Sequence, residues 1–149
     1  MDKKNVNIFI ATTPGPKQRR GVYMYLLEAR KANGECVTRQ QMMLQEDTTE
    51  NQLAICALEA ALGRMTAPAN LTIWTDCGYL YGVLVNRQFE RWRQQAWKNE
   101  KGEPIKYVDK WLRIEYLLDA HDFQVRHREH HEYAGWMARE MKKEYAKKV

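Results

Sequence analysis

Two acidic residues stand where an α/β chain places functional groups. Asp76 directly follows the apolar segment 71–75, which reads as a buried strand, and ligands of α/β sheets bind at such strand ends. Glu50 lies in the first turn of a predicted helix, where a carboxylate either binds a metal ion or offsets the positive end of the helix dipole. For Asp76 the structural alternative is an N-cap of the next helix. Residue types alone leave these alternatives open.

Three histidines, His127, His130 and His131, precede the last predicted helix. Histidine is a common zinc ligand, but no cysteine lies near these residues in the sequence and their spacing fits no known zinc motif. A solvated polar loop is the structural alternative. The sequence therefore leaves the role of this group open.

Residues 87–113 form a basic and aromatic segment with eight Lys or Arg and four acidic residues. Basic side chains bind phosphates and release counterions, and aromatic rings pack on sugars or bases. The aromatic residues alternatively pack on one another. We expect this packing for Trp92 and Trp111, and we expect Lys98 and its basic neighbours to face nucleic acid. The candidate nucleic-acid-binding residues are Arg87, Arg91, Arg93, Lys98, Lys101 and Lys106.

Composition is that of a soluble globular protein with a modest positive charge. The chain has 149 residues, and 24 Lys and Arg against 19 Asp and Glu give a net charge of +5, which permits a polyanionic partner without requiring one. No apolar run approaches the roughly 20 residues of a membrane span, and no signal peptide is visible. The isolated Cys36, Cys56 and Cys77 predict no disulfide framework. We expect a cytoplasmic, monomeric protein.

The hydrophobic pattern predicts one domain over residues 1–149, with a mixed sheet covered by helices. Asn33-Gly34 marks a hairpin between the second and third strands. Strands are predicted at 6–10, 21–29, 35–43, 71–75 and 123–126. Helices are predicted at 48–62, 79–85, 87–98, 108–118 and 133–148.

The segment 89–118 resembles the basic handle and following helix of bacterial type 1 ribonuclease H. The residues that carry this likeness are Trp92, Trp97-Lys98, Pro104, Lys106, Val108-Asp109 and Trp111. Further likeness lies at Asn7-Ile8-Phe9, Pro14-Gly15-Pro16, residues 55–60 and residues 75–79. The resemblance implies an α/β fold of the ribonuclease H-like kind, with a five-stranded mixed sheet of order 3-2-1-4-5, helices on both faces and a handle at about 87–113.

The resemblance also implies an active site of four carboxylates that bind two divalent ions, Mg²⁺ or Mn²⁺. Two of the four carry over, onto Glu50 and Asp76. The other two fall on Ala11 in the first strand and Gly135 in the last helix, and Glu132 is a possible substitute one turn earlier. Two carboxylates predict weak binding of a single ion or none, because Mg²⁺ requires oxygen ligands in near-octahedral geometry.

Three functions follow from these observations. The leading hypothesis is a ribonuclease H-like protein that binds nucleic-acid duplexes, RNA–DNA hybrid preferred, with lost or strongly weakened metal-dependent phosphodiester hydrolysis. The first alternative is an active ribonuclease H that cleaves the RNA strand of hybrids with a remodelled metal site. The second is a protein-interaction scaffold on the same fold. In the family a loop histidine assists product release, and His127, His130 or His131 is a candidate for that role.

Overall fold

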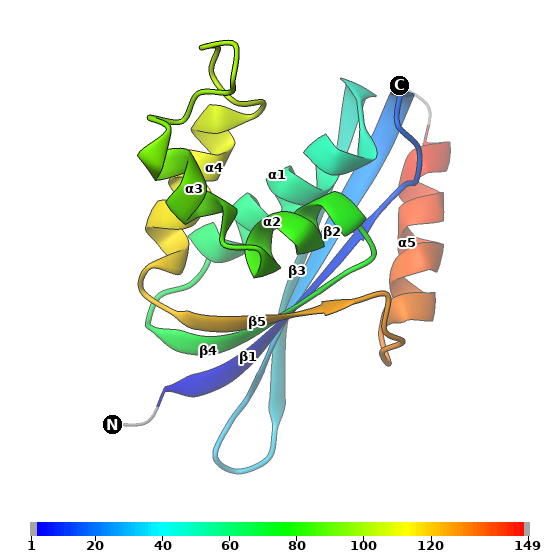
Figure 1. The fold of residues 1–149 in the computed structure, drawn as a ribbon. Coiled ribbons are helices and arrows are strands. Elements are labelled where there is room, and N and C mark those ends of the chain that lie inside the picture. Colours follow the sequence, from blue (N-terminus) through cyan, green and yellow to red (C-terminus); the bar gives the residue numbers. More distant parts are fainter. Residues whose placement is uncertain (1–2, 148–149) are drawn as a thin grey trace.

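One five-stranded sheet organises the chain, in the order β3-β2-β1-β4-β5 (Figure 1). The computed structural model describes residues 3–147. Strands β1, β2 and β3 pair antiparallel, and β4 and β5 run parallel to β1. The order confirms the prediction. The strands are β1 (Lys4–Thr12), β2 (Gln18–Arg30), β3 (Cys36–Thr48), β4 (Ala69–Thr75) and β5 (Asp122–His127).

Helices cover both faces of this sheet, as predicted. In Figure 1, α1 to α4 lie on one side and α5 lies on the other, across β1, β2 and β3. None of the described helices combines the length and the apolar character needed to cross a bilayer. The helices are α1 (Glu50–Gly63), α2 (Gly78–Val85), α3 (Gln88–Gln94), α4 (Val108–Leu118) and α5 (Ala134–Ala146).

The alternation of β1 builds a core on each face of the sheet. Successive side chains of a strand point to opposite faces. Ile8 and Ile10 therefore pack in the larger core under α1, while Phe9 packs with Met137 and Met141 of α5. Ala11 follows Phe9 in the alternation and also packs on the α5 side. The end of β1 is thereby directed at the start of the last helix.

Several predicted boundaries are wrong. The helix predicted at 87–98 ends at Gln94, because Ala96 and Trp97 take positive φ angles of 54° and 61° and turn the chain back. The returning segment is held by the Ile105 N–H, which donates to the Trp97 carbonyl at 3.0 Å. Strands β2 and β3 extend beyond their predicted ends, since they pair continuously from Gln18 with Thr48 up to the Asn33-Gly34 hairpin. The final helix ends at Ala146, and Lys148 lies outside the described residues.

Candidate functional site

A cavity of about 300 Å³ lies where the ends of β1 and β4 meet the starts of α1 and α5. We call it the carboxylate pocket. It brings together Ala11, Glu50 and Asp76, which are far apart in the sequence. Its other lining includes Glu129, His131, Ala134 and Ala138.

Glu50 is fixed by the turn between β1 and β2. Thr49 caps α1, because its hydroxyl accepts the Gln52 N–H at 3.0 Å. The Glu50 N–H donates to the Gly15 carbonyl at 3.0 Å, and the Gly15 N–H donates to Glu50 Oε1 at 3.4 Å. Glu50 thus occupies the first turn, where a negative charge suits the helix dipole, and also lines the pocket. For Glu50, offsetting the helix dipole and facing a possible metal site are therefore compatible roles.

Asp76 does not cap α2. The N-cap position is Cys77, and the Cys77 N–H is accepted by the Thr75 hydroxyl at 3.0 Å, so the capping alternative for Asp76 is wrong. The exposed Asp76 side chain lines the pocket instead. A bond from Cys77 Sγ to Asn51 Oδ1, 3.4 Å long, ties this turn to the start of α1. Burial raises the pKa of the Cys77 thiol, and the charge of Glu50 acts in the same direction.

Helix α5 presents small and apolar side chains to the pocket. Ala134 and Ala138 line it, one turn apart, whereas Gly135 is exposed and is not part of the lining. A Cβ on Gly135 would lie 3.3 Å from Arg139 Nη1. Glu132, the candidate substitute, is exposed and does not line the pocket either. Glu129, a loop carboxylate that the sequence did not single out, does line the pocket. Its Oε2 lies 3.7 Å from Arg126 Nη1.

The donor set of the carboxylate pocket does not fit a pair of divalent ions. A two-ion site needs carboxylates from several elements at once. Glu50 and Asp76 supply two, the third lining carboxylate, Glu129, is paired with Arg126, and β1 contributes only the methyl group of Ala11. Within residues 3–147, no group of three or more His, Cys, Asp and Glu side chains is placed to hold a metal ion.

The three loop histidines occupy separate environments. His131 lines the carboxylate pocket and packs on Phe9, with ring centroids 4.3 Å apart. Burial lowers the pKa of His131, and the nearby charge of Asp76 opposes this change. His127 stacks on Tyr81 with centroids 4.6 Å apart, and its buried Nε2 has no hydrogen-bond partner in the part of the chain that the structure describes. His130 is exposed. His131 is therefore the histidine placed beside the carboxylates.

Aromatic packing holds the handle, residues 87–113, in shape. Trp111 is wholly buried, and the Trp92 ring lies 5.8 Å from it, which confirms the packing expected for both residues. Trp97 joins them, 5.7 Å from Trp92. The hydroxyls of Tyr107 and Thr49 lie 3.2 Å apart and connect the handle to the start of α1. The handle is thus packed around its aromatic side chains and is joined to α1 one residue before Glu50.

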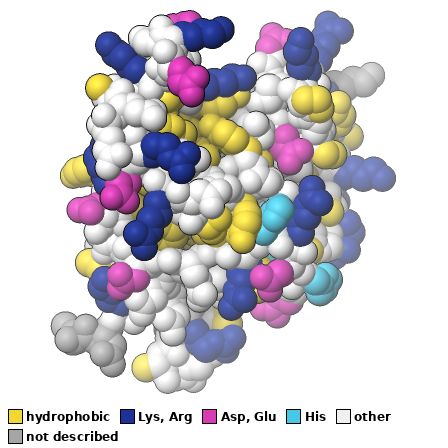
Figure 2. Space-filling model, viewed as in Figure 1, with side chains coloured by type: hydrophobic (Ala, Val, Ile, Leu, Met, Phe, Trp, Pro, Cys, Tyr) yellow, Lys and Arg dark blue, Asp and Glu magenta, His cyan; other side chains and the backbone are white. Residues whose placement is uncertain are grey.

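The candidate basic residues of the handle all have exposed side chains. Lys and Arg side chains surround apolar ones over α3 and the loop after it (Figure 2). Arg93 differs from the rest, because it forms an ion pair with Glu115 of α4. Among the described ion pairs, none involves the other five. They are Arg87, Arg91, Lys98, Lys101 and Lys106.

Comparison with known proteins finds one family. A sequence profile described as RNase H matches residues 4–148. The ribonuclease H of Dinoroseobacter shibae is 31% identical over 113 residues, which cover 74% of this chain and 68% of that protein. The ribonuclease H of Nitratidesulfovibrio vulgaris is 34% identical over 79 residues, or 53% of this chain and 49% of that protein. The first relatives are thus matched over about half of their length.

Solved structures share the fold. LC9-RNase H1, described as a type 1 RNase H with the type 2 active-site motif, superposes with a TM-score of 0.74 at 20% identity, covering 92% of this chain and 71% of that one. The foamy viral protease-reverse transcriptase in complex with RNA/DNA hybrid gives a TM-score of 0.68 at 19% identity, over 94% of this chain and 19% of that one. At these identities the likeness concerns the fold alone.

Proposed function

This chain belongs to the ribonuclease H family, and we propose that it binds RNA–DNA hybrid duplexes while its hydrolysis of the RNA strand is lost or strongly weakened. Family membership supports nucleic-acid binding. The foamy viral relative of this fold was solved in complex with a hybrid, which makes hybrid the first ligand to test.

The composition of the carboxylate pocket carries this proposal. Glu50 and Asp76 are kept, but Ala11 occupies the end of β1, where the family resemblance implies an aspartate. Helix α5 adds Ala134 and Ala138. A methyl group has no lone pair for a divalent cation, and hydrolysis by two ions needs both held beside the reacting phosphate. The lining of the pocket thus supports loss or weakening of two-ion hydrolysis.

The handle supports the binding part of the proposal. Five of its cations have exposed side chains and form no ion pair within residues 3–147, and phosphate contacts supply most of the sequence-independent affinity for a duplex. The Tyr107–Thr49 contact places this element next to the carboxylate pocket. A duplex seated on the handle therefore has one strand near Glu50.

A second candidate function, an active enzyme with a remodelled site, is favoured by one observation. Glu129 and His131 line the same pocket as Glu50 and Asp76, so additional donors lie within it. LC9-RNase H1 is described as carrying the active-site motif of another type, which illustrates variation of such sites within this fold.

An assay on labelled hybrid separates these functions. Binding is measured by fluorescence anisotropy in EDTA, and cleavage is measured in Mg²⁺ and in Mn²⁺ beside the Dinoroseobacter shibae ribonuclease H. We expect binding together with cleavage at least about 100-fold slower than that relative, since one electrostatic contribution to an active site is worth about that much. Fast cleavage that Asp76→Asn abolishes would establish the active enzyme. An absence of binding to any duplex at low salt would favour the interaction scaffold.

A further inference from the structure

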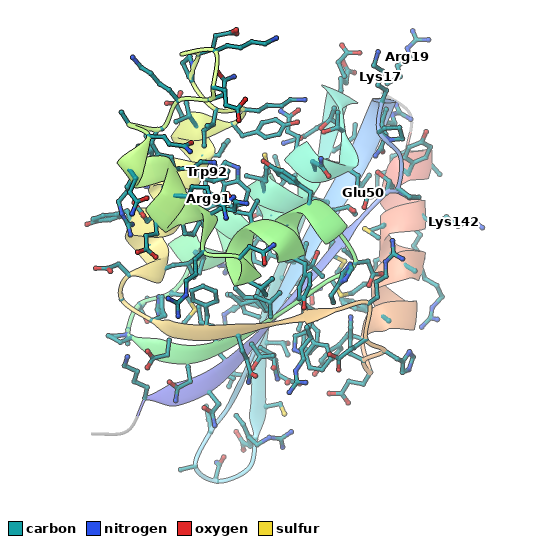
Figure 3. All side chains as sticks on the ribbon, viewed as in Figure 1. Lys17, Arg19, Glu50, Arg91, Trp92 and Lys142 are labelled. Atoms are coloured by element: carbon teal, nitrogen blue, oxygen red, sulfur yellow. The ribbon has the colours of Figure 1, made fainter. Side chains whose placement is uncertain are left out.

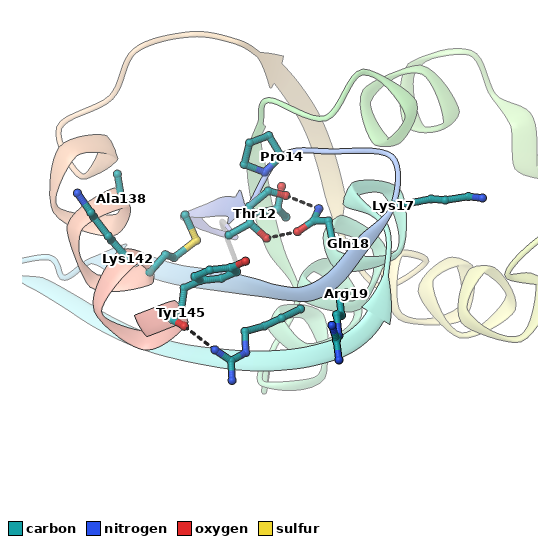
Figure 4. Close-up of a pocket in the computed structure, with 11 residues that line it drawn as sticks. Thr12, Pro14, Lys17, Gln18, Arg19, Ala138, Lys142 and Tyr145 are labelled. Atoms are coloured by element: carbon teal, nitrogen blue, oxygen red, sulfur yellow. Dashed lines mark hydrogen bonds between the residues drawn. The ribbon is translucent and has the colours of Figure 1, made fainter. Parts of the chain in front are cut away.

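A second cavity, of about 670 Å³, opens beside the carboxylate pocket between the β1–β2 turn and α5 (Figure 4). We call it the turn–α5 pocket. It is adjacent to the carboxylate pocket, because four residues line both. They are Thr12, Pro14, Ala138 and Met141.

The β1–β2 turn that forms one wall is internally braced. Gln18 Nε2 donates to the carbonyls of Thr13 and Gly15 at 2.8 and 3.1 Å, and the Thr13 hydroxyl donates to Gln18 Oε1 at 2.5 Å. The Val22 N–H donates to the Thr13 hydroxyl at 3.0 Å. These bonds fix the turn without any partner molecule. The wall is therefore preorganised.

Basic side chains surround this pocket. Lys17, Arg19 and Lys142 are exposed, and none of them has an ion-pair or side-chain hydrogen-bond partner within residues 3–147. Glu46 and Asp47 do not line this pocket, but they line a neighbouring cavity that shares Arg19, Arg20 and Tyr145 with it. Among the described residues, the lining of the turn–α5 pocket contains no carboxylate. Its charge therefore favours an anion such as a phosphate.

An aromatic ring lies among these cations. Tyr145 is 45% exposed, which is high for a large aromatic residue, and Figure 4 shows its ring between Lys142 and Arg19. Arg20 holds it in place, donating to the Tyr145 carbonyl at 3.1 Å with its guanidinium carbon 5.8 Å from the ring centroid. Met141 adds an apolar floor. A basic rim around an anchored, exposed ring is the combination that binds unpaired nucleotides.

The position of this pocket fits a strand that leaves the duplex. In Figure 3, Glu50 lies between the handle residues Arg91 and Trp92 on one side and Lys142 on the other. A duplex presents its phosphates but hides its base faces, so only an unpaired nucleotide can use the ring and the apolar floor of this pocket.

We propose that the turn–α5 pocket binds an unpaired nucleotide of a single-stranded tail, with its phosphate on Arg19 and Lys142 and its base on Tyr145. The tail continues the strand that passes Glu50. This inference rests on the proposed binding of hybrid duplex and adds a second site to it.

The test compares a blunt hybrid with the same hybrid carrying a four-nucleotide tail at each strand end in turn, by anisotropy in EDTA. In the wild type, one tail should raise affinity about tenfold, as expected from stacking of a single base plus a phosphate contact. The double variant Arg19→Ala with Lys142→Ala should lose that gain while its affinity for the blunt hybrid stays within about twofold. Tyr145→Phe should keep the gain, and Tyr145→Ala should lose it.

Lys143→Ala is the matched control. Lys143 is adjacent in the same helix but is paired with Glu140 at 3.1 Å and does not line the pocket, so the gain from the tail should survive. The inference is overturned if no tail raises the affinity of the wild type, or if the gain persists without Arg19 and Lys142. Failure of the blunt hybrid to bind would instead contradict the proposed function itself.

Discussion

The handle and the carboxylate pocket differ in how their residues must cooperate. The handle presents five exposed cations on an aromatic scaffold, and in general each phosphate bound by such a side chain adds affinity of its own. The pocket presents Glu50, Asp76 and Glu129 among alanine and methionine side chains, but within residues 3–147 no three such groups are placed to hold a metal ion, and a two-ion site acts only as a complete unit. Binding of nucleic acid therefore tolerates gradual change in sequence, whereas hydrolysis disappears when a single ligand is replaced. One domain can keep the first function without the second.

The largest expected effect comes from rebuilding the pocket. Ala11→Asp combined with Ala134→Asp places carboxylates at two positions that line it, and we expect cleavage of hybrid in Mg²⁺ to rise at least about 100-fold. Each single change should have little effect, because the ligands act together. Cleavage is measured on a labelled hybrid, and Mg²⁺ binding by calorimetry.

The matched control is Ala11→Asp with Gly135→Asp. This pair follows the sequence resemblance, but Gly135 lies outside the lining of the pocket, so it should give much less activity. If it proves the more active pair, the register of α5 inferred from the structure is wrong. If the variant Ala11→Asp with Ala134→Asp binds Mg²⁺ and still fails to cleave, this chain differs from an active ribonuclease H in more than the metal ligands of the pocket.

A smaller effect is expected from removing charge on the handle. The triple change Arg91→Ala, Lys98→Ala and Lys101→Ala should lower affinity for hybrid about tenfold or more at low salt. It should also reduce the slope of log affinity against log salt by about one unit for each phosphate that the variant no longer binds. The measurement is anisotropy at several salt concentrations in EDTA. Arg93→Ala is the control, because Arg93 is paired with Glu115 and should change the slope less. If Arg93→Ala reduces the salt slope as much as the single change Arg91→Ala does, the ion pair between Arg93 and Glu115 opens when the duplex binds.

The hydrophobic pattern predicted a mixed sheet covered by helices, whereas the strand order and the positions Ala11, Glu50 and Asp76, which converge on the pocket from β1, α1 and the end of β4, were implied by the family resemblance. These elements have strong alternation or capping signals, such as Ile8 to Ile10 in β1 and Thr49 before α1. The face of α5 was not predictable in the same way. A shift of one residue rotates a helix position by about 100°, which separates Gly135 from Ala134. The end of α3 was missed because Ala96 and Trp97, rather than a glycine, adopt the positive φ angles there.

The smallest predicted effect concerns the contact that fixes α5 beside the pocket. Glu28 of β2 is only 7% exposed. Its carboxylate accepts the Tyr133 hydroxyl at 2.5 Å and Asn7 Nδ2 at 2.9 Å. Burial raises the pKa of Glu28, but the hydrogen bonds from Tyr133 and Asn7, together with smaller contributions from Glu132 and the charge of Arg30, outweigh it, so the net pKa of Glu28 is lowered. A carboxylate with a lowered pKa stabilises the fold above its unfolded pKa, and this stabilisation is lost as the pH falls through the folded value.

Tyr133→Phe should therefore reduce the free energy of unfolding by about 1.5 kcal/mol at pH 7, the lower end of the usual range for losing a hydrogen bond to a charged group. The ring still packs on Phe9, whose centroid lies 5.2 Å away, so the loss should be confined to the hydroxyl. Below about pH 4 the difference between variant and wild type should shrink, because Glu28 is then protonated in the unfolded chain and increasingly in the folded one. Urea unfolding at pH 7 and at about pH 3.5 measures both values. A difference that is the same at the two pH values would show that the Tyr133 hydroxyl does not act through the charge of Glu28. The hydroxyl would then stabilise the start of α5 through a hydrogen bond that does not depend on the ionisation of Glu28.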